Sequence, residues 1–178
     1  MAVDGIFITT ELEGELAKRI HALQLRFDPK MGNFLPPHVT LIGSSGAGPA
    51  PSDTPLAVLK ERIFSVTDTF APLTLRFGAP ERFVQREIVS LRLDPHGPLR
   101  TLHERLKECG LSFFQSRYPF TPHCTLNLYP TLTAANLKAM LAVRETEPFT
   151  VHTLRVYHTR DPQKPKLLFS AELKGSAS

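Results

Sequence analysis

Cysteine and long apolar runs are both scarce in this sequence. Its 178 residues include only Cys109 and Cys124, without a Cys-x-x-Cys pair, which speaks against a disulfide framework or a cysteine zinc site. No segment approaches the run of about 18 apolar residues that a membrane helix requires. The N-terminus has neither the basic region nor the long apolar region of a secretion signal. We therefore expect a cytoplasmic protein that has no membrane partner.

Blocks of basic residues are also missing, although Lys and Arg outnumber Asp and Glu by 21 to 17 and give a formal net charge of +4. A weak positive field speeds the encounter with phosphates. The cations are scattered, however, and do not form the arms typical of many nucleic-acid-binding proteins. Charge therefore favours an anionic partner only weakly.

The glycine-rich stretch at residues 43–53 contains no lysine. A phosphate loop of the Walker type ends in Gly-Lys-Ser/Thr, which places a lysine on the phosphates, so this stretch is not such a loop. Its composition is typical of a surface crossover, which we expect, with a mobile rim over a cleft as the alternative.

The periodicity of apolar residues divides the rest of the chain into strands and helices. We expect strands at residues 6–10, 38–43, 73–77, 88–93, 122–129, 149–157 and 166–173, and helices at residues 11–25, 56–66, 99–108 and 133–144. The third and fourth of these strands are expected to pair as a hairpin. The order strand, helix, strand with a shared motif occurs twice. This predicts an α+β fold in one domain, residues 1–178, whose two equivalent halves surround a cleft with antiparallel sheets and flanking helices, and which ends in a flexible tail at residues 175–178.

The shared motif reads apolar-x-Pro-His-x-Thr-Leu and stands at residues 35–41 and 120–126. Side chains alternate along a strand with a period of two, so His38 and Thr40 project from one face, and His123 and Thr125 do the same in the second copy. The residues between and after them are apolar and point the opposite way. One face can therefore be core while the other looks into the cleft.

Two imidazoles that face one cleft can divide the work of phosphoryl transfer. One removes a proton from the attacking oxygen and the other gives a proton to the leaving oxygen, since an ordinary pKa of about 6.5 makes both forms accessible near neutrality. The two threonine hydroxyls can donate to the non-bridging phosphate oxygens and stabilise the charge that builds there. This chemistry requires no metal and no cofactor.

A single His-x-Thr segment would be weak evidence, because a histidine on a strand is more often a surface or structural residue. Only two of the 7 histidines have Thr at the second following position, and the recurrence favours catalysis. A metal-dependent hydrolase is one alternative, and it would have to recruit His152 or His158 as a further ligand. An RNA-end binding protein with little turnover is another.

On these two motifs the chain resembles the 2H phosphoesterase superfamily, in the branch of the 2'-5' RNA ligase-like proteins and cyclic phosphodiesterases. The resemblance follows the element order over nearly the whole chain and rests, residue by residue, on the two His-x-Thr-Leu segments. It implies a bilobal, pseudo-twofold fold with both motifs in the cleft. It also implies action, without metal or cofactor, on RNA ends with 2',3'-cyclic phosphates, on cyclic nucleotides or on 2'-5' linkages. In that scheme His123 activates water and His38 protonates the leaving 3' oxygen. We expect a monomer.

Many relatives of that kind read His-x-Thr-Leu-Ala-Arg at the second motif, whereas this chain has Leu128 at the position of the arginine. Alternation predicts that Leu128 lies in the core and that Asn127 and Tyr129 lie on the cleft face, where they would bind substrate. The arginine that grips the phosphate would then be Arg92 or Arg155, for each of which a solvated surface charge is the alternative.

An aromatic cluster occupies residues 113–118. It could form a platform on which RNA bases stack. A strand that enters the core would account for its two phenylalanines more simply, and this is what we expect.

Overall fold

The computed structural model of the chain describes residues 4–83, 86–129 and 132–176. Its strands are β1 (Asp4–Glu11), β2 (His38–Ile42), β3 (Leu73–Leu75), β4 (Pro80–Arg82), β5 (Val89–Arg92), β6 (His123–Asn127), β7 (Phe149–Val151), β8 (Thr153–Arg160) and β9 (Lys166–Glu172). Its helices are α1 (Gly14–Phe27), α2 (Pro29–Gly32), α3 (Leu56–Thr67), α4 (Pro98–Lys107) and α5 (Ala134–Leu141).

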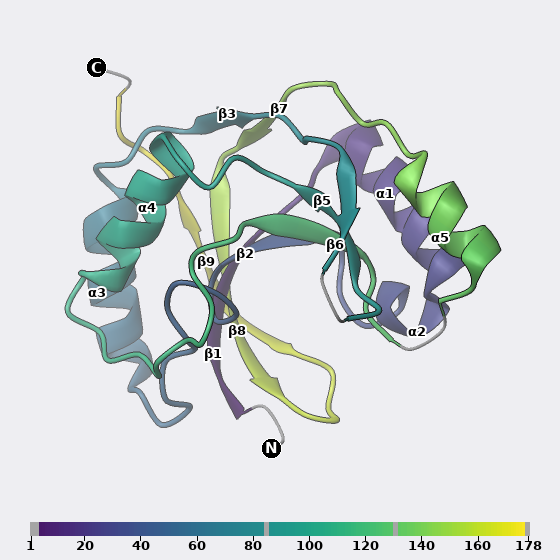
Figure 1. Cartoon of the computed structure of the whole chain (residues 1–178). Coiled ribbons are helices and arrows are strands. Elements are labelled where there is room, and N and C mark those ends of the chain that lie inside the picture. The colour runs from purple at the N-terminus through teal and green to yellow at the C-terminus, as the bar shows by residue number, and fades with distance from the viewer. Residues whose placement is uncertain (1–3, 84–85, 130–131, 177–178) are drawn as a thin grey trace.

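These strands form antiparallel sheets. One sheet has the strand order β2-β1-β8-β9, a second has the order β4-β5-β6, and β3 pairs with β7. In Figure 1, α3 and α4 lie along one side of the molecule and α1 and α5 along the other, with the sheets between them. The predicted α+β fold, with antiparallel sheets and flanking helices, is confirmed.

Each half of the chain sends a helix to the other half. Helix α1 follows β1 but packs against β6, and α4 follows β5 but packs against β2. The two motif strands, β2 and β6, also lie against each other. The halves therefore interlock, and each motif strand is supported by a helix from the opposite half.

Helix α4 illustrates how the sequence sets these elements. Leu99, Leu102 and Leu106 recur at helical spacing and are at most 1% exposed, so they form the stripe that packs on the sheet. Pro98 occupies the first turn, where its missing N–H costs nothing. Gly110, with a φ of 91°, follows shortly after the helix ends, in a conformation that favours glycine.

The predicted hairpin between residues 73–77 and 88–93 is wrong. Strand β3 pairs with β7, so that Leu73 faces Val151, while β5 pairs with β4 and β6. Alternation marks a strand but does not specify its partner. The predicted strand at 149–157 is also interrupted, because the exposed His152 separates β7 from β8.

Gly175, the first residue of the expected flexible tail, is held by a backbone hydrogen bond. The N–H of Gly175 donates to the carbonyl of Phe70 at 3.0 Å, and that of Lys174 donates to Thr67 at 2.9 Å. These bonds fasten the chain beside the end of α3. Residues 177–178 of the expected tail lie outside the described residues.

Candidate active site

The two motif strands alternate as the sequence predicts. Val39, Leu41, Cys124 and Leu126, the apolar residues of the inward face, are all 0% exposed. The histidines and threonines of the other face are partly exposed. The two strands are in direct contact, and the Cys124 thiol lies close to the backbone of His38.

Each motif threonine lies beside a second hydroxyl. Thr9 of β1 is opposite Thr40, Ser90 of β5 is opposite Thr125, and in both ladders the next pair skips one residue of the motif strand. Such a β-bulge bends a strand and re-aims its side chains, and bulges are frequent beside active sites. The hydroxyls of Thr9 and Ser90 are buried without a hydrogen-bond partner in the described part of the chain. The site thus contains two equivalent pairs of hydroxyls.

The two imidazoles are held by the same local contact. Nδ1 of His38 lies 2.8 Å from the Pro36 carbonyl oxygen, and Nδ1 of His123 lies 2.7 Å from that of Thr121. Because a carbonyl oxygen only accepts, each Nδ1 carries a proton and donates it, and Nε2 is the basic nitrogen of the neutral ring. Burial lowers the pKa of both imidazoles, which favours the neutral form before a ligand enters.

A cleft of about 770 Å³ opens beside the motifs. Its volume lies in the range of small-molecule sites. Its lining includes Thr40, His123 and Thr125, with Ser44 and Ser45 from the glycine-rich stretch, which therefore contributes to the rim as well as crossing over. His38 is not part of this lining, but it lies on the same strand face as Thr40, two residues before it.

The structure places Arg155 on the motif face of β8, opposite Thr9. Its Nη1 donates to the Ser170 hydroxyl at 2.5 Å, and its Nε lies 3.7 Å from a carboxylate oxygen of Glu11. The other carboxylate oxygen of Glu11 accepts a hydrogen bond from the Tyr157 hydroxyl. A phosphate at Arg155 would have to compete with Glu11, and its role in substrate binding stays a prediction.

Arg92 lies on the motif face of β5, directly opposite His123. Its Nη1 donates to Glu81 at 2.7 Å, and both side chains are about 40% exposed. The guanidinium is close enough to His123 to lower the pKa of that imidazole, an effect smaller than that of burial. Its role in substrate binding also stays a prediction.

The prediction that Leu128 lies in the core is wrong. Oδ2 of Asp28 accepts the backbone N–H groups of Leu128 and Tyr129 at 2.8 and 2.9 Å, and β6 ends at Asn127. The alternation stops there, because these two N–H groups bind the carboxylate and do not continue the ladder. Leu128 is 45% exposed and lines the cleft.

Asn127 and Tyr129 are not among the described residues that line the cleft. The Asn127 side-chain amide is buried and donates to the carbonyls of Glu87 and Tyr129 at 2.6 and 3.1 Å. The Tyr129 ring lies beneath the ammonium group of Lys30, which is 4.0 Å from the ring centroid. Their substrate-binding roles stay predictions.

Sequence reasoning did not single out Phe83 and Arg86, which line the cleft, and it considered Tyr118, which also lines it, only as part of an aromatic cluster. The Phe83 ring stands edge-on to the His123 ring, with centroids 5.0 Å apart. Nη2 of Arg86 donates to the Tyr118 hydroxyl at 3.4 Å. Phe83, Arg86 and Tyr118 lie outside the helices and strands, so no periodicity points to them. Their position is decided by how distant segments meet.

The expected strand at residues 113–118 is not formed. Only Gln115 makes an isolated bridge, to Ala47. Phe113 packs against the core as predicted, whereas Phe114 and Tyr118 are 52% and 56% exposed. Tyr118 is the member of this cluster that reaches the cleft.

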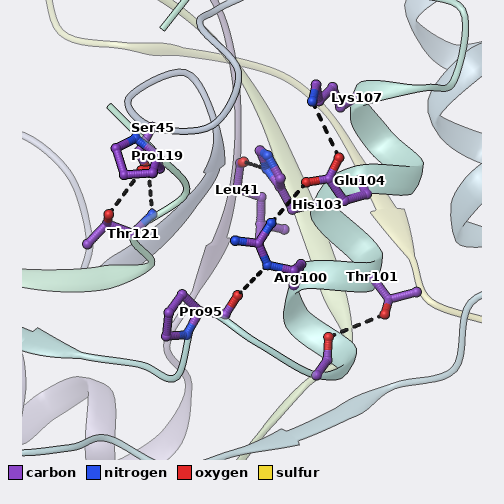
Figure 2. Close-up of polar contacts among 11 residues, drawn as sticks. Leu41, Ser45, Pro95, Arg100, Thr101, His103, Glu104, Lys107, Pro119 and Thr121 are labelled. Carbon is purple, nitrogen blue, oxygen red and sulfur yellow. Dashed lines mark hydrogen bonds and ion pairs between the residues drawn. The ribbon is translucent and has the colours of Figure 1, made fainter. Parts of the chain in front are cut away.

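Buried polar side chains from the crossing helices hold both motif strands. His103 of α4 reaches the Leu41 carbonyl with Nδ1 at 2.7 Å (Figure 2). Gln24 of α1 donates to the Thr125 carbonyl at 2.8 Å. A further bond joins the segments next to the motifs, where the Ser45 hydroxyl accepts the N–H of Thr121 at 3.0 Å (Figure 2). The backbone is therefore fixed beside each catalytic candidate.

Within residues 4–83, 86–129 and 132–176, no group of three His, Cys, Asp or Glu side chains is arranged to hold a metal ion. Of the two histidines that a metal site would have to recruit, His158 binds Asp4 at 2.8 Å and His152 is exposed. In the same residues, no helix has the length and apolar character that a membrane span requires.

The family model described as the 2'-5' RNA ligase superfamily matches residues 12–163. The chain belongs to this superfamily. Membership of the 2'-5' RNA ligase superfamily indicates a phosphoesterase or ligase-like enzyme, in agreement with the resemblance seen in the motifs. No curated protein matches the chain.

This 2'-5' RNA ligase superfamily protein shares its fold with solved structures. TT0787 of Thermus thermophilus has a TM-score of 0.64 at 17% identity, over 99% of this chain and 100% of that one. E. coli LigT in apo form has a TM-score of 0.63 at 18% identity, over 96% and 97%. A structure described as a phosphoesterase gives 0.59 at 18% identity, over 96% and 98%. At such identities the likeness shows the fold alone.

Proposed function

We propose that this 2'-5' RNA ligase superfamily protein is a metal-independent phosphoesterase of RNA ends, which hydrolyses 2',3'-cyclic phosphates, reversibly forms 2'-5' linkages, or does both. His38 and His123 act as general acid and base, and Thr40 and Thr125 hold the phosphate. The observation that carries the proposal is the equivalent geometry of the two motifs, each with an imidazole that donates to a backbone carbonyl and a threonine beside a bulge.

In the hydrolysis, the oxygen of water attacks phosphorus and the bond from phosphorus to the 3' oxygen breaks. One Nε2 accepts the proton of the water, and the other imidazolium gives its proton to the leaving oxygen, which leaves a 2'-phosphate. The two threonine hydroxyls donate to the non-bridging oxygens as charge builds on them. A 5'-hydroxyl of RNA in place of water forms a 2'-5' linkage, and the reverse reaction cleaves it.

The cleft supports a nucleotide as the ligand. Tyr118 offers an exposed ring on which a base can stack, and Arg86 is a lining cation that can replace the arginine missing at Leu128. Arg92, Arg155, Asn127 and Tyr129 remain further candidates for substrate contacts. E. coli LigT, which has the same fold, has been crystallised with 3'-AMP, ATP and NADP+.

The test is to incubate the protein, in EDTA, with 2',3'-cyclic nucleotides and with RNA that ends in a cyclic phosphate, and to identify the products. We expect 2'-phosphates from the wild type and losses of about 10²-fold or more for His38→Ala and His123→Ala. His96→Ala and His152→Ala, which change exposed histidines, are the matched controls. Strong activity in either motif variant would contradict the two-histidine mechanism.

Two other outcomes would select the alternatives. Tight binding of the cyclic-phosphate RNA without any product would favour an RNA-end binding protein. Loss of activity in EDTA that zinc or manganese restores would favour a metal-dependent hydrolase.

A further inference from the structure

The two histidines face opposite charges at equivalent positions. In the pairing of β1 with β2, Glu11 lies directly opposite His38. In the equivalent pairing of β5 with β6, Arg92 lies directly opposite His123. Directly opposed side chains of an antiparallel pair are about 5 Å apart at Cβ, so each charge acts on its imidazole at close range.

The next strand of each sheet supplies the counter-ion. Arg155 of β8 lies 3.7 Å from Glu11, and Glu81 of β4 lies 2.7 Å from Arg92. Arg155 is opposite Thr9 of β1, and Glu81 is opposite Ser90 of β5. In each sheet, therefore, one charged residue is opposite the motif histidine and its counter-ion lies on the next strand. The residue opposite the histidine is a Glu in one half and an Arg in the other.

We infer that these opposite charges give the two histidines different roles. Glu11 favours the protonated form of His38, which acts as the general acid, and Arg92 favours the neutral form of His123, which acts as the general base. The inference rests on the proposed function and adds two positioning residues to it. Glu11 and Arg92 act through the imidazoles, because each is engaged by its counter-ion on the adjacent strand.

The physical cause is the field of each neighbour on the imidazolium. Burial lowers the pKa of both rings, but Glu11 raises that of His38, whereas the pKa of His123 is lowered further by His38 and by Arg92. Arg155 and Glu81 oppose these effects from one strand further away. When the anionic phosphate enters, it favours imidazolium at both sites, and the field of Glu11 adds to this effect at His38 while that of Arg92 opposes it at His123.

The inference can be tested without substrate by NMR titration of the histidine rings in the full chain. We expect Glu11→Gln to move the midpoint of His38 to lower pH and Arg92→Gln to move that of His123 to higher pH. Glu145→Gln, which removes a carboxylate paired with Arg19 on the surface, should shift neither. Unshifted midpoints in both variants, with folding checked by circular dichroism, would overturn the inference whatever the activity.

A second measurement assigns the roles directly. A 3'-deoxynucleoside 2'-(4-nitrophenyl phosphate), in which nitrophenoxide takes the place of the 3' oxygen, has a leaving group that departs without a proton, so loss of the general acid is tolerated. We expect His38→Ala to stay within about tenfold of the wild type on this ester while it loses about 10²–10⁴-fold on a cyclic nucleotide, and His123→Ala to lose activity on both. Rescue of His123→Ala alone would reverse the assignment. If the wild type converts neither compound, the proposed function fails, while the titration still decides the role of Glu11 and Arg92.

Discussion

At the scale of single residues, the buried hydroxyls opposite the motif threonines are unusual because they lack hydrogen bonds. Thr9 and Ser90 are 3% and 0% exposed, and neither hydroxyl has a partner in the described part of the chain. A buried hydroxyl without a hydrogen bond costs about 1–3 kcal/mol. Thr9 is opposite Thr40 and Ser90 is opposite Thr125. When the hydroxyls of Thr40 and Thr125 donate to a bound phosphate, their oxygens can accept hydrogen bonds from the buried hydroxyls of Thr9 and Ser90.

The motif threonines should contribute through the transition state. Thr40→Ala and Thr125→Ala are each expected to lower kcat/KM about 10²-fold, because each removes a donor to the non-bridging oxygens. Steady-state kinetics on a 2',3'-cyclic nucleotide would measure this, with Thr40→Ser and Thr125→Ser as variants that keep the hydroxyl. An effect on KM alone, with kcat unchanged, would argue for ground-state binding instead.

At the scale of elements, the Asp28 side chain joins a helix start to a strand end. It is 1% exposed, its Oδ1 accepts the N–H of Met31 at the start of α2, and its Oδ2 accepts the two N–H groups that follow β6. One carboxylate thus satisfies three backbone donors. It also turns Leu128 out of the sheet and into the cleft.

Removing this carboxylate should destabilise the whole domain. Asp28→Ala is expected to lower the free energy of unfolding by about 2 kcal/mol or more, because it leaves backbone donors buried and unpaired. Urea denaturation would measure the change. The matched control is Thr133→Ala, which removes the capping bond to Asn136 at the exposed start of α5 and should cost about 1 kcal/mol. Equal effects of the two substitutions would contradict the structural role given to Asp28.

At the scale of the whole molecule, His103 is part of the contact between the interlocked halves. It is fully buried, donates to Leu41 in β2 and stacks on the Phe120 ring, with centroids 4.0 Å apart, at the entrance to the second motif. Its Nε2 has no hydrogen-bond partner among the residues that the structure describes, and a Cβ at Gly46 would lie only 2.3 Å from that nitrogen. Burial lowers the pKa of the imidazole.

The folded protein should therefore lose stability in mild acid. The unfolded histidine takes up a proton near its ordinary pKa of 6.5, and the folded one only at lower pH, so the unfolded state binds more protons in between and the free energy of unfolding falls as the pH falls through this window. Urea denaturation between about pH 7.5 and 5 would measure the slope.

His103→Asn, which keeps a donor for the Leu41 carbonyl, should weaken this pH dependence. His96→Asn, at an exposed position, is the matched control and should leave it unchanged. His38 and His123, whose pKa values burial also lowers, contribute a part that persists in both variants. The same slope in His103→Asn as in the wild type would show that protonation of His103 is not involved.

The sequence by itself determined the motif faces, most of the helices and strands, and the family. His38 with Thr40 and His123 with Thr125 share a face because alternation is a local property of any strand. The stripe of α4 and the buried residues between the motif histidines and threonines follow from the same short-range periodicities. Chemistry that depends only on neighbours along the chain could therefore be predicted.

Only the tertiary structure decided which distant residues meet. Pairing and register set Glu11 against His38 and Arg92 against His123, and the crossing of segments brought Arg86 and Tyr118 to the cleft. Even the turn of Leu128 into the cleft depends on a carboxylate 100 residues away in the sequence. Strand partners and side-chain contacts of this kind are fixed by the packing of the whole chain, and no local period encodes them.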